Sequence, residues 1–146
     1  MKGFDGAWTC DTKFPANAMG PGTPEVIGKS TVKFKKELGG MFWRGDYVVK
    51  KQKGIPMNFS GILYVGWDPG ANQALLTAVD STGGVVTETG KIEGDTVNLT
   101  GDGWMMGQKI KVKESMGKKS PKEAWHKFEV DMGHGWMPMG EDSCKK

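Results

Sequence analysis

The final stretch of the chain, HGWMPMGEDSCKK, gathers side chains that could bind a soft metal ion. It holds His134, Met137, Met139 and Cys144, with the two methionines at M-x-M spacing. Thioether and thiolate groups suit Cu(I), so copper binding is one hypothesis for this tail. Residues two apart on a β-strand share a face, however, and methionine commonly fills irregular apolar space. Core packing is therefore the favoured interpretation, and it extends to Met105, Met106 and Met132.

The other histidine, His126, lies in the segment EAWHKFEVDM, where it alternates in phase with Phe128 and Val130. This pattern predicts an inward side chain, and the simplest role for it is a core or rim histidine with satisfied hydrogen bonds. A Cys–His nucleophilic pair could be built from Cys10 or Cys144 with a histidine. Because the chain has two cysteines, a disulfide bond between them is the better explanation.

Established catalytic motifs are missing from the sequence. It contains no G-x-S-x-G elbow, no H-E-x-x-H pair and no phosphate-binding P-loop. The glycine-rich segments GDGWMMG and STGG do not lie between a strand and a helix, where a phosphate cradle would need them. We interpret them as turns. Enzymatic activity is therefore not indicated, and no cofactor is predicted.

The segment MFWRGDYVVK carries charge on one strand face and aromatic rings on the other. Arg44 and Asp46 share one face, and Trp43 and Tyr47 share the opposite face. If the charged face points inward, Arg44 could orient an acidic ligand or pair with a carboxylate, since an unpaired buried arginine is costly. If it points outward, the aromatic residues form the interior and Arg44 is solvated. The sequence leaves both arrangements open.

Aromatic side chains are expected in the core or in a pocket wall, Trp136 among them. The candidate ligand-binding residues are four of these aromatic residues together with Arg44 and the inward histidine. They are Trp43, Arg44, Tyr64, Trp67, Trp104 and His126.

Charge argues against a nucleic-acid partner. The net charge is +3, arginine occurs once, and acidic residues are interleaved with the lysines of KFKK, VVKKQK and KIKVK. A protein that tracks a phosphate backbone carries denser positive charge. No apolar run approaches the roughly 20 residues of a membrane-spanning helix, so no membrane span is predicted.

A period of two dominates the chain and indicates β-strands. In QKIKVKES, for example, Ile110 and Val112 alternate with lysines. The runs are separated by the turn sequences LGG, DPG, STGG, EGD and GKKSPK, and residues 14–25 form a longer loop with three prolines and two glycines. No segment predicts a capped amphipathic helix of ten or more residues.

These strands predict an all-β fold: a single antiparallel up-and-down barrel of about nine or ten strands, lipocalin-like, in one domain over residues 1–146. A meander must close or split to remove its exposed edges, and closure is the economical solution. A two-sheet sandwich is the alternative.

Closure would make the first and last strands neighbours, and each carries one cysteine. We therefore predict a Cys10–Cys144 disulfide, which in the chain-entropy model contributes about 5 kcal/mol because it encloses nearly the whole chain. It would imply an oxidising compartment, so the protein is expected to be periplasmic or secreted although no leader precedes the first strand. Free cysteines would instead indicate the cytoplasm.

Several segments together resemble the DUF1579 family of bacterial proteins of unknown function. They are GAWTC, ELGGMFWRGDYVVK, GILYVGWDPGANQALLTAVDSTGG, GDTVNLTGDGWMMGQKIKVKES and KFEVDMGHGWMPMGEDSCKK, and they cover most of the chain from Phe4 onward. The chain is similar to myxobacterial members of this family that look like exported proteins. The resemblance implies a barrel like those of lipocalins and fatty-acid-binding proteins. The barrel class also resembles nitrobindin-type haem proteins, in which a late-strand histidine holds the iron, so haem at His126 is a further hypothesis.

The function predicted from these observations is binding of a small apolar or amphipathic molecule inside the barrel. The alternative is a structural or interaction protein whose barrel is filled by its own methionine and tryptophan side chains. Haem or copper binding is a lesser alternative. The sequence does not indicate an oligomeric state.

Overall fold

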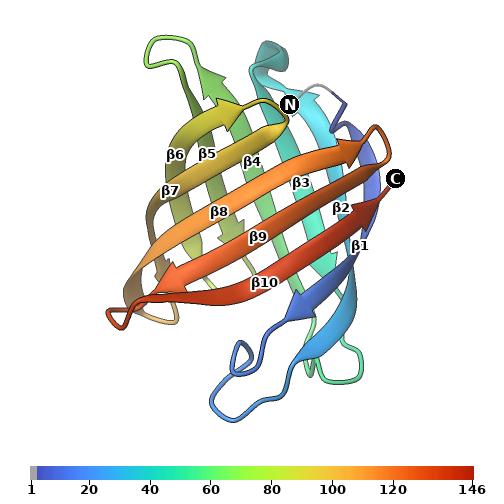
Figure 1. Ribbon diagram of the computed structural model, residues 1–146, viewed down its shortest axis with the longest axis vertical. Coiled ribbons are helices and arrows are strands. Elements are labelled where there is room, and N and C mark those ends of the chain that lie inside the picture. Colours follow the sequence, from blue (N-terminus) through green and yellow to red (C-terminus); the bar gives the residue numbers. More distant parts are fainter. Residues whose placement is uncertain (1–2) are drawn as a thin grey trace.

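Ten antiparallel strands run through residues 3–146, the part of the chain that this computed structural model describes (Figure 1). In chain order they are β1 (Gly6–Phe14), β2 (Val26–Glu37), β3 (Phe42–Val49), β4 (Phe59–Asp68), β5 (Gln73–Asp80), β6 (Val85–Glu93), β7 (Thr96–Met105), β8 (Gln108–Ser120), β9 (Glu123–Asp131) and β10 (Trp136–Lys145). One short 3₁₀ helix, η1 (Leu38–Gly40), turns the chain between β2 and β3.

Each strand pairs with its neighbour in sequence, and β1 pairs with β10, so the sheet closes on itself. The predicted all-β up-and-down barrel is thus confirmed, with ten strands. A two-sheet sandwich is wrong because the seam between the first and last strands is hydrogen-bonded. The start of β1 and the end of β10 lie at the same end of the barrel (Figure 1). Full closure leaves no free sheet edge among these strands, which removes the usual site of edge-to-edge aggregation.

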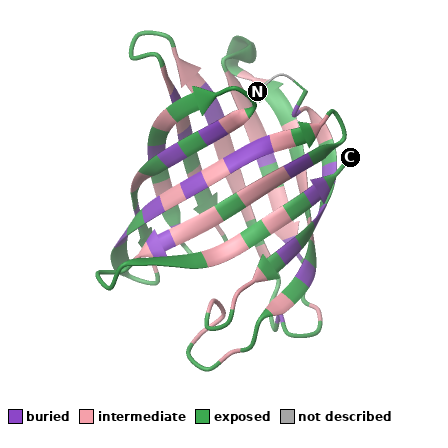
Figure 2. Ribbon diagram, in the orientation of Figure 1, coloured by how far each residue is buried: buried purple, intermediate pink, exposed green. Residues whose placement is uncertain are grey.

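The period-two pattern of the sequence becomes an inner and an outer wall. Buried and exposed residues alternate along the strands, most plainly on β1 and β7 (Figure 2). On β8, Ile110 and Val112 are at most 2% exposed, and Lys109 and Lys111 beside them face water, as predicted. Inward residues of neighbouring strands lie opposite one another in register, as Val112 does with Val130.

Apolar side chains pack inside the barrel in three groups. The first centres on the middle strands, the second on the seam, and the third on β8 and β9. Their buried members are Val65, Ala74, Leu76, Val97, Leu99 and Met116 in the first; Phe4, Trp8, Cys10, Ala124 and Cys144 in the second; and Ile110, Val112 and Val130 in the third. Polar inward residues lie among these groups and are described below.

The aromatic face of β3 points inward. Gly45 and Val49 on that face are buried, whereas Arg44 and Asp46 alternate with them and form an ion pair, 2.8 Å between Nη2 and Oδ1, on the outer wall. Inward Tyr47 lies opposite Gly61 of β4, and a Cβ atom there would overlap the tyrosine ring. The glycine thus gives the ring its place inside the barrel.

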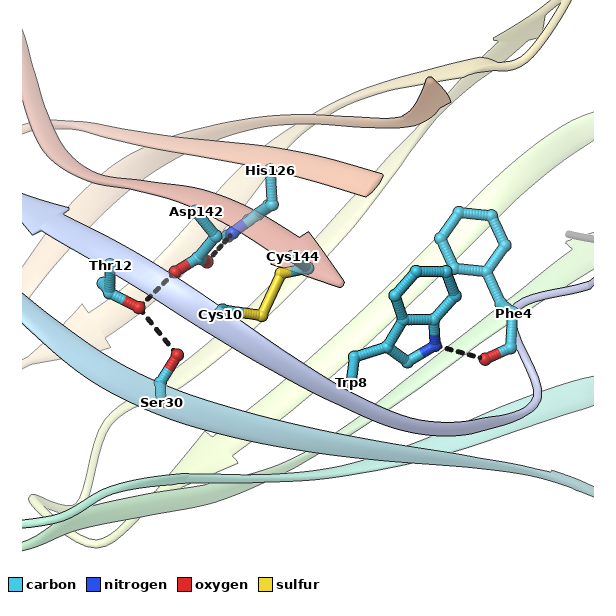
Figure 3. The surroundings of a disulfide bond; sticks show 8 residues. All are labelled: Phe4, Trp8, Cys10, Thr12, Ser30, His126, Asp142 and Cys144. Atoms are coloured by element: carbon cyan, nitrogen blue, oxygen red, sulfur yellow. Dashed lines mark hydrogen bonds and ion pairs between the residues drawn. A yellow bond between two sulfur atoms is a disulfide. The ribbon is translucent and has the colours of Figure 1, made fainter. Parts of the chain in front are cut away.

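Cys10 of β1 and Cys144 of β10 are directly opposite in the seam and form the predicted disulfide. Beside it, the chain leading into β1 folds over the barrel end. Phe4 is buried there, and its carbonyl oxygen accepts a 2.9 Å hydrogen bond from the Trp8 indole N–H (Figure 3). Strand pairing, the disulfide and the packing of Phe4 and Trp8 therefore all stabilise the closure of the barrel at the seam.

Replacing both cysteines by serine should lower the free energy of unfolding by up to about 5 kcal/mol, because the bridge spans 134 residues and restricts the unfolded chain. Urea denaturation followed by tryptophan fluorescence measures the change. Reduced wild-type protein is the matched control and should behave like the double variant. Equal stability of oxidised and reduced protein would contradict this role.

Candidate functional site

A continuous chain of polar side chains crosses the inner wall at the seam (Figure 3). Ser30 lies 2.6 Å from Thr12, and the Thr12 hydroxyl donates to Asp142. The other oxygen of Asp142 lies 2.9 Å from His126 Nδ1. His126 Nε2 lies 2.9 Å from Glu114 Oε2. We call Glu114, His126 and Asp142 the acid–histidine cluster.

Strand register positions the acid–histidine cluster. Thr12 of β1, Asp142 of β10 and His126 of β9 are direct cross-strand partners in one row. Glu114 of β8 lies diagonally from His126, because its direct partner is Phe128. Cross-strand and diagonal neighbours on one face of a sheet are close enough for side-chain contact. The contacts of His126 thus follow from the consecutive pairing of β8, β9 and β10, and the contact of Thr12 with Asp142 follows from barrel closure.

Both nitrogens of His126 are occupied by carboxylates. Burial lowers the pKa of His126, but hydrogen bonds with Asp142 and Glu114, together with the attraction of their charges, outweigh it and raise that pKa to about 10. The ring is therefore a cation at neutral pH and donates from both nitrogens. A general base or a haem ligand needs a free ring nitrogen, so this arrangement favours neither catalysis nor iron binding at His126.

A further carboxyl group, Glu88 of β6, is fully buried on the inner wall. It is 1% exposed, and neither of its oxygens has a hydrogen-bond partner. Burial, with the nearby negative charge of Glu114, raises the pKa of Glu88 to about 9, and the cation of His126 opposes this only in part. Glu88 is therefore protonated at neutral pH. Burial also raises the pKa of inward Tyr47, with Asp80 and Glu114 adding to the effect.

Accessible space lies beside the acid–histidine cluster. The side chains of His126 and Asp142 keep 30% and 23% of their surface accessible, although both point inward. Gly140 of β10 lies opposite inward Phe128, and no atom lies within 4 Å of the position that a Cβ atom would occupy. An L-residue side chain could therefore enter this space. The cluster borders it and is not sealed in the packed core.

The structure divides the six candidate ligand-binding residues between the two walls. Trp43, Trp67 and His126 face inward, and Trp67 packs against the first apolar group. Arg44 and Tyr64 are direct partners on the outer wall, and the Tyr64 hydroxyl lies 3.4 Å from Glu37. These two residues therefore cannot line the interior: their strand neighbours hold the inward positions.

Trp104 also lies on the outer wall and is 54% exposed. The prediction that it belongs to the core or a pocket wall inside the barrel is wrong. Gly103 pairs with inward Val86 and Ile110, so the next residue, Trp104, points outward. Trp136 is 43% exposed, with the Lys113 ammonium 4.6 Å from its ring centroid, so it too is not a core residue.

The methionines of the tail do not share one face. Met139 packs against the third apolar group, as core packing predicts, whereas Met137 is 43% exposed. A β-bulge between Pro138 and Gly140 breaks the alternation on which the shared-face expectation rested. The disulfide removes both thiols as copper ligands. Within residues 3–146, no group of three or more His, Cys, Asp or Glu side chains is arranged to hold a metal ion.

Two shallow depressions lie on the outer wall, one beside Val85 and Trp104, the other between Asp46 and Val79. The charged residues that line them are aspartates alone. The inner acid–histidine cluster therefore remains the stronger candidate for a functional site.

Five residues of the inner polar network were missed from the sequence: Thr12, Ser30, Glu88, Glu114 and Asp142. A signal existed for Glu114, which follows Ile110 and Val112 at the next inward position of KIKVKES, and for Asp142, which precedes Cys144 by two. Glu88 was harder to find, because VVTETGKI mixes polar and apolar residues on both faces.

Comparisons of the chain with family models and with curated proteins found no match. Among residues 3–146, no helix has the length and apolar character needed to cross a bilayer.

The inner network should make the protein less stable in alkali. In the folded state the pKa of Glu88 is about 9, against an ordinary value of 4.5. The pKa of folded His126 is about 10, against an ordinary value of 6.5. Between pH 7 and 9 the folded state therefore binds more protons than the unfolded state, and stability falls as pH rises, by up to about 1.4 kcal/mol per pH unit for each group.

Urea denaturation at pH 7, 8 and 9 measures this slope. Glu88→Gln should reduce it, and Glu123→Gln, a change of an exposed glutamate, should leave it unchanged. A wild-type protein equally stable at pH 7 and 9 would contradict the assignment.

Proposed function

We propose that this protein binds a small amphipathic molecule inside the barrel, with the polar end of the ligand against the acid–histidine cluster. The supporting observation is that the inner wall combines this partly accessible hydrogen-bonded cluster with apolar side chains. Sites for small molecules are typically apolar, with a few placed polar groups that set orientation. Barrels of this strand number can enclose one small ligand.

Incomplete filling of the interior supports a ligand over the alternative of a solidly packed barrel. Phe34, Leu63 and Phe128 point inward and yet are only half-buried. The open position beside Gly140 lies on the same wall. A barrel whose only role is structural gains nothing from such space, because unfilled volume forfeits packing contacts.

Unpartnered polar atoms provide a second line of support. Within the described residues, the buried side-chain atoms without a hydrogen-bond partner are Trp43 Nε1 and both carboxyl oxygens of Glu88, all from inward-facing residues. A buried donor or acceptor left without a partner costs about 1–3 kcal/mol. A ligand with complementary polar groups would relieve part of that cost. Trp43 thus remains a candidate ligand-binding residue together with His126.

We further propose that the protein works in the periplasm or outside the cell. The buried disulfide fits an extracellular location, because cytosolic thiols are kept reduced. Membership of the DUF1579 family is likewise a proposal, with which the barrel architecture is consistent.

The binding proposal is tested with Nile red, a neutral dye that fluoresces in apolar surroundings, added to protein stripped of lipid. Wild-type protein should bind the dye saturably. Gly140→Leu fills the open position and should weaken binding about tenfold or more. Ser143→Leu places the same side chain on the exposed outer face of the same strand and should bind like wild type.

Circular dichroism of both variants checks that the barrel is folded. No saturable dye binding by the wild type, or equal binding by a folded Gly140→Leu protein, would refute the proposed interior site.

A further inference from the structure

We propose that the ligand carries a cationic head, an alkylammonium group, which the carboxyl groups of Glu114, Asp142 and Glu88 recognise. This inference rests on the proposed interior binding of an amphipathic molecule and adds the chemical class of its polar end.

Charge is the first argument. The acid–histidine cluster holds two carboxylates, Glu114 and Asp142, against one imidazolium, His126, which leaves an excess of negative charge. The charges of Glu114 and Asp142 act on His126. The charges of Glu114 and His126 act on Glu88. Lys118 shares the inner face of β8 but lies toward the covered end, with Nζ 5.8 Å from the ring centroid of Phe4.

Hydrogen-bonding capacity points the same way. Both N–H groups of His126 already donate to carboxylates, and the Thr12 hydroxyl donates to Asp142. Since Thr12 uses its hydrogen there, Ser30 donates to Thr12 across their 2.6 Å contact. Apart from the O–H group of protonated Glu88, what the network still offers is the lone pairs of carboxyl oxygens. An ammonium group has three donors and no acceptor, which complements that surface.

Glu88 is the independent observation that indicates a ligand. It is 1% exposed, it faces the same interior, and neither oxygen has a partner. Burying a carboxyl group beside Glu114, with no donor to either of its oxygens, is unfavourable, since the two groups would repel if both ionised. A bound cation would lower that repulsion. The three carboxyl groups would attract a cationic ligand, whereas they would repel an anionic one.

An apolar tail has room beside this head-group site. The open position at Gly140 borders Phe128, and Met139 packs against the third apolar group next to it. An anionic amphiphile such as a fatty acid would meet carboxylates there. The one arginine of the chain, Arg44, is paired with Asp46 on the outer wall and is not available to it.

Competition by three amphiphiles with the same twelve-carbon tail tests the head group. Dodecylamine, dodecanol and dodecanoate are titrated at pH 7, below micelle formation, against the protein–Nile red complex. We expect dodecylamine to displace the dye at a concentration about tenfold or more below that of the other two. Glu114→Gln and Asp142→Asn should each reduce this preference, and Glu123→Gln on the exposed surface should preserve it.

The outcomes separate the two proposals. Equal displacement by all three amphiphiles, or preferred displacement by dodecanoate, would overturn the cationic head group and leave interior binding intact. Failure of the wild type to bind Nile red would overturn both. Because the wild-type comparison alone discriminates among head groups, the test does not depend on the folding of the carboxylate variants.

Discussion

Hydrogen bonding between β1 and β10 is the interaction on which the rest of this structure depends. It converts an open meander into a barrel and gives every strand two neighbours. The same pairing brings Cys10 to Cys144 and Thr12 to Asp142, although about 130 residues separate the members of each pair. Closing so long a loop is entropically costly, and the disulfide offsets part of that cost by restricting the unfolded chain. The seam thus stabilises the barrel and joins Thr12 to the acid–histidine cluster.

The polar network is a liability for folding. Removing charged groups from water is costly, and a buried ion pair is often no better for stability than apolar side chains of the same size. His126 limits this cost by donating to two carboxylates at once. Glu88 limits it differently, by keeping its proton. Both solutions bind protons that the unfolded chain would release in alkali, so the network links the stability of the barrel to pH.

The fold could be predicted because alternation is a local signal. QKIKVKES and EAWHKFEVDM show their inner faces directly, and the closed meander then places the two cysteines together. The site could be predicted only in part. The inward direction of His126 follows from alternation, but its contacts with Glu114 and Asp142 depend on the stagger between strands, which alternation does not give. Trp104 and Tyr64 show the opposite failure: their size suggested the interior, while strand phase puts them outside.

Glu88 is the residue on which the proposal of a binding interior most depends. An apolar residue at this position would extend the packing of Leu76 and Leu99 around it and would need no proton. A buried carboxyl without a partner is therefore costly in the empty barrel, and the same is true of the open space at Gly140. Under the proposed function, both features become favourable when a ligand fills the space and supplies the missing partner. The groups that destabilise the empty barrel are then the same groups from which a ligand gains binding energy.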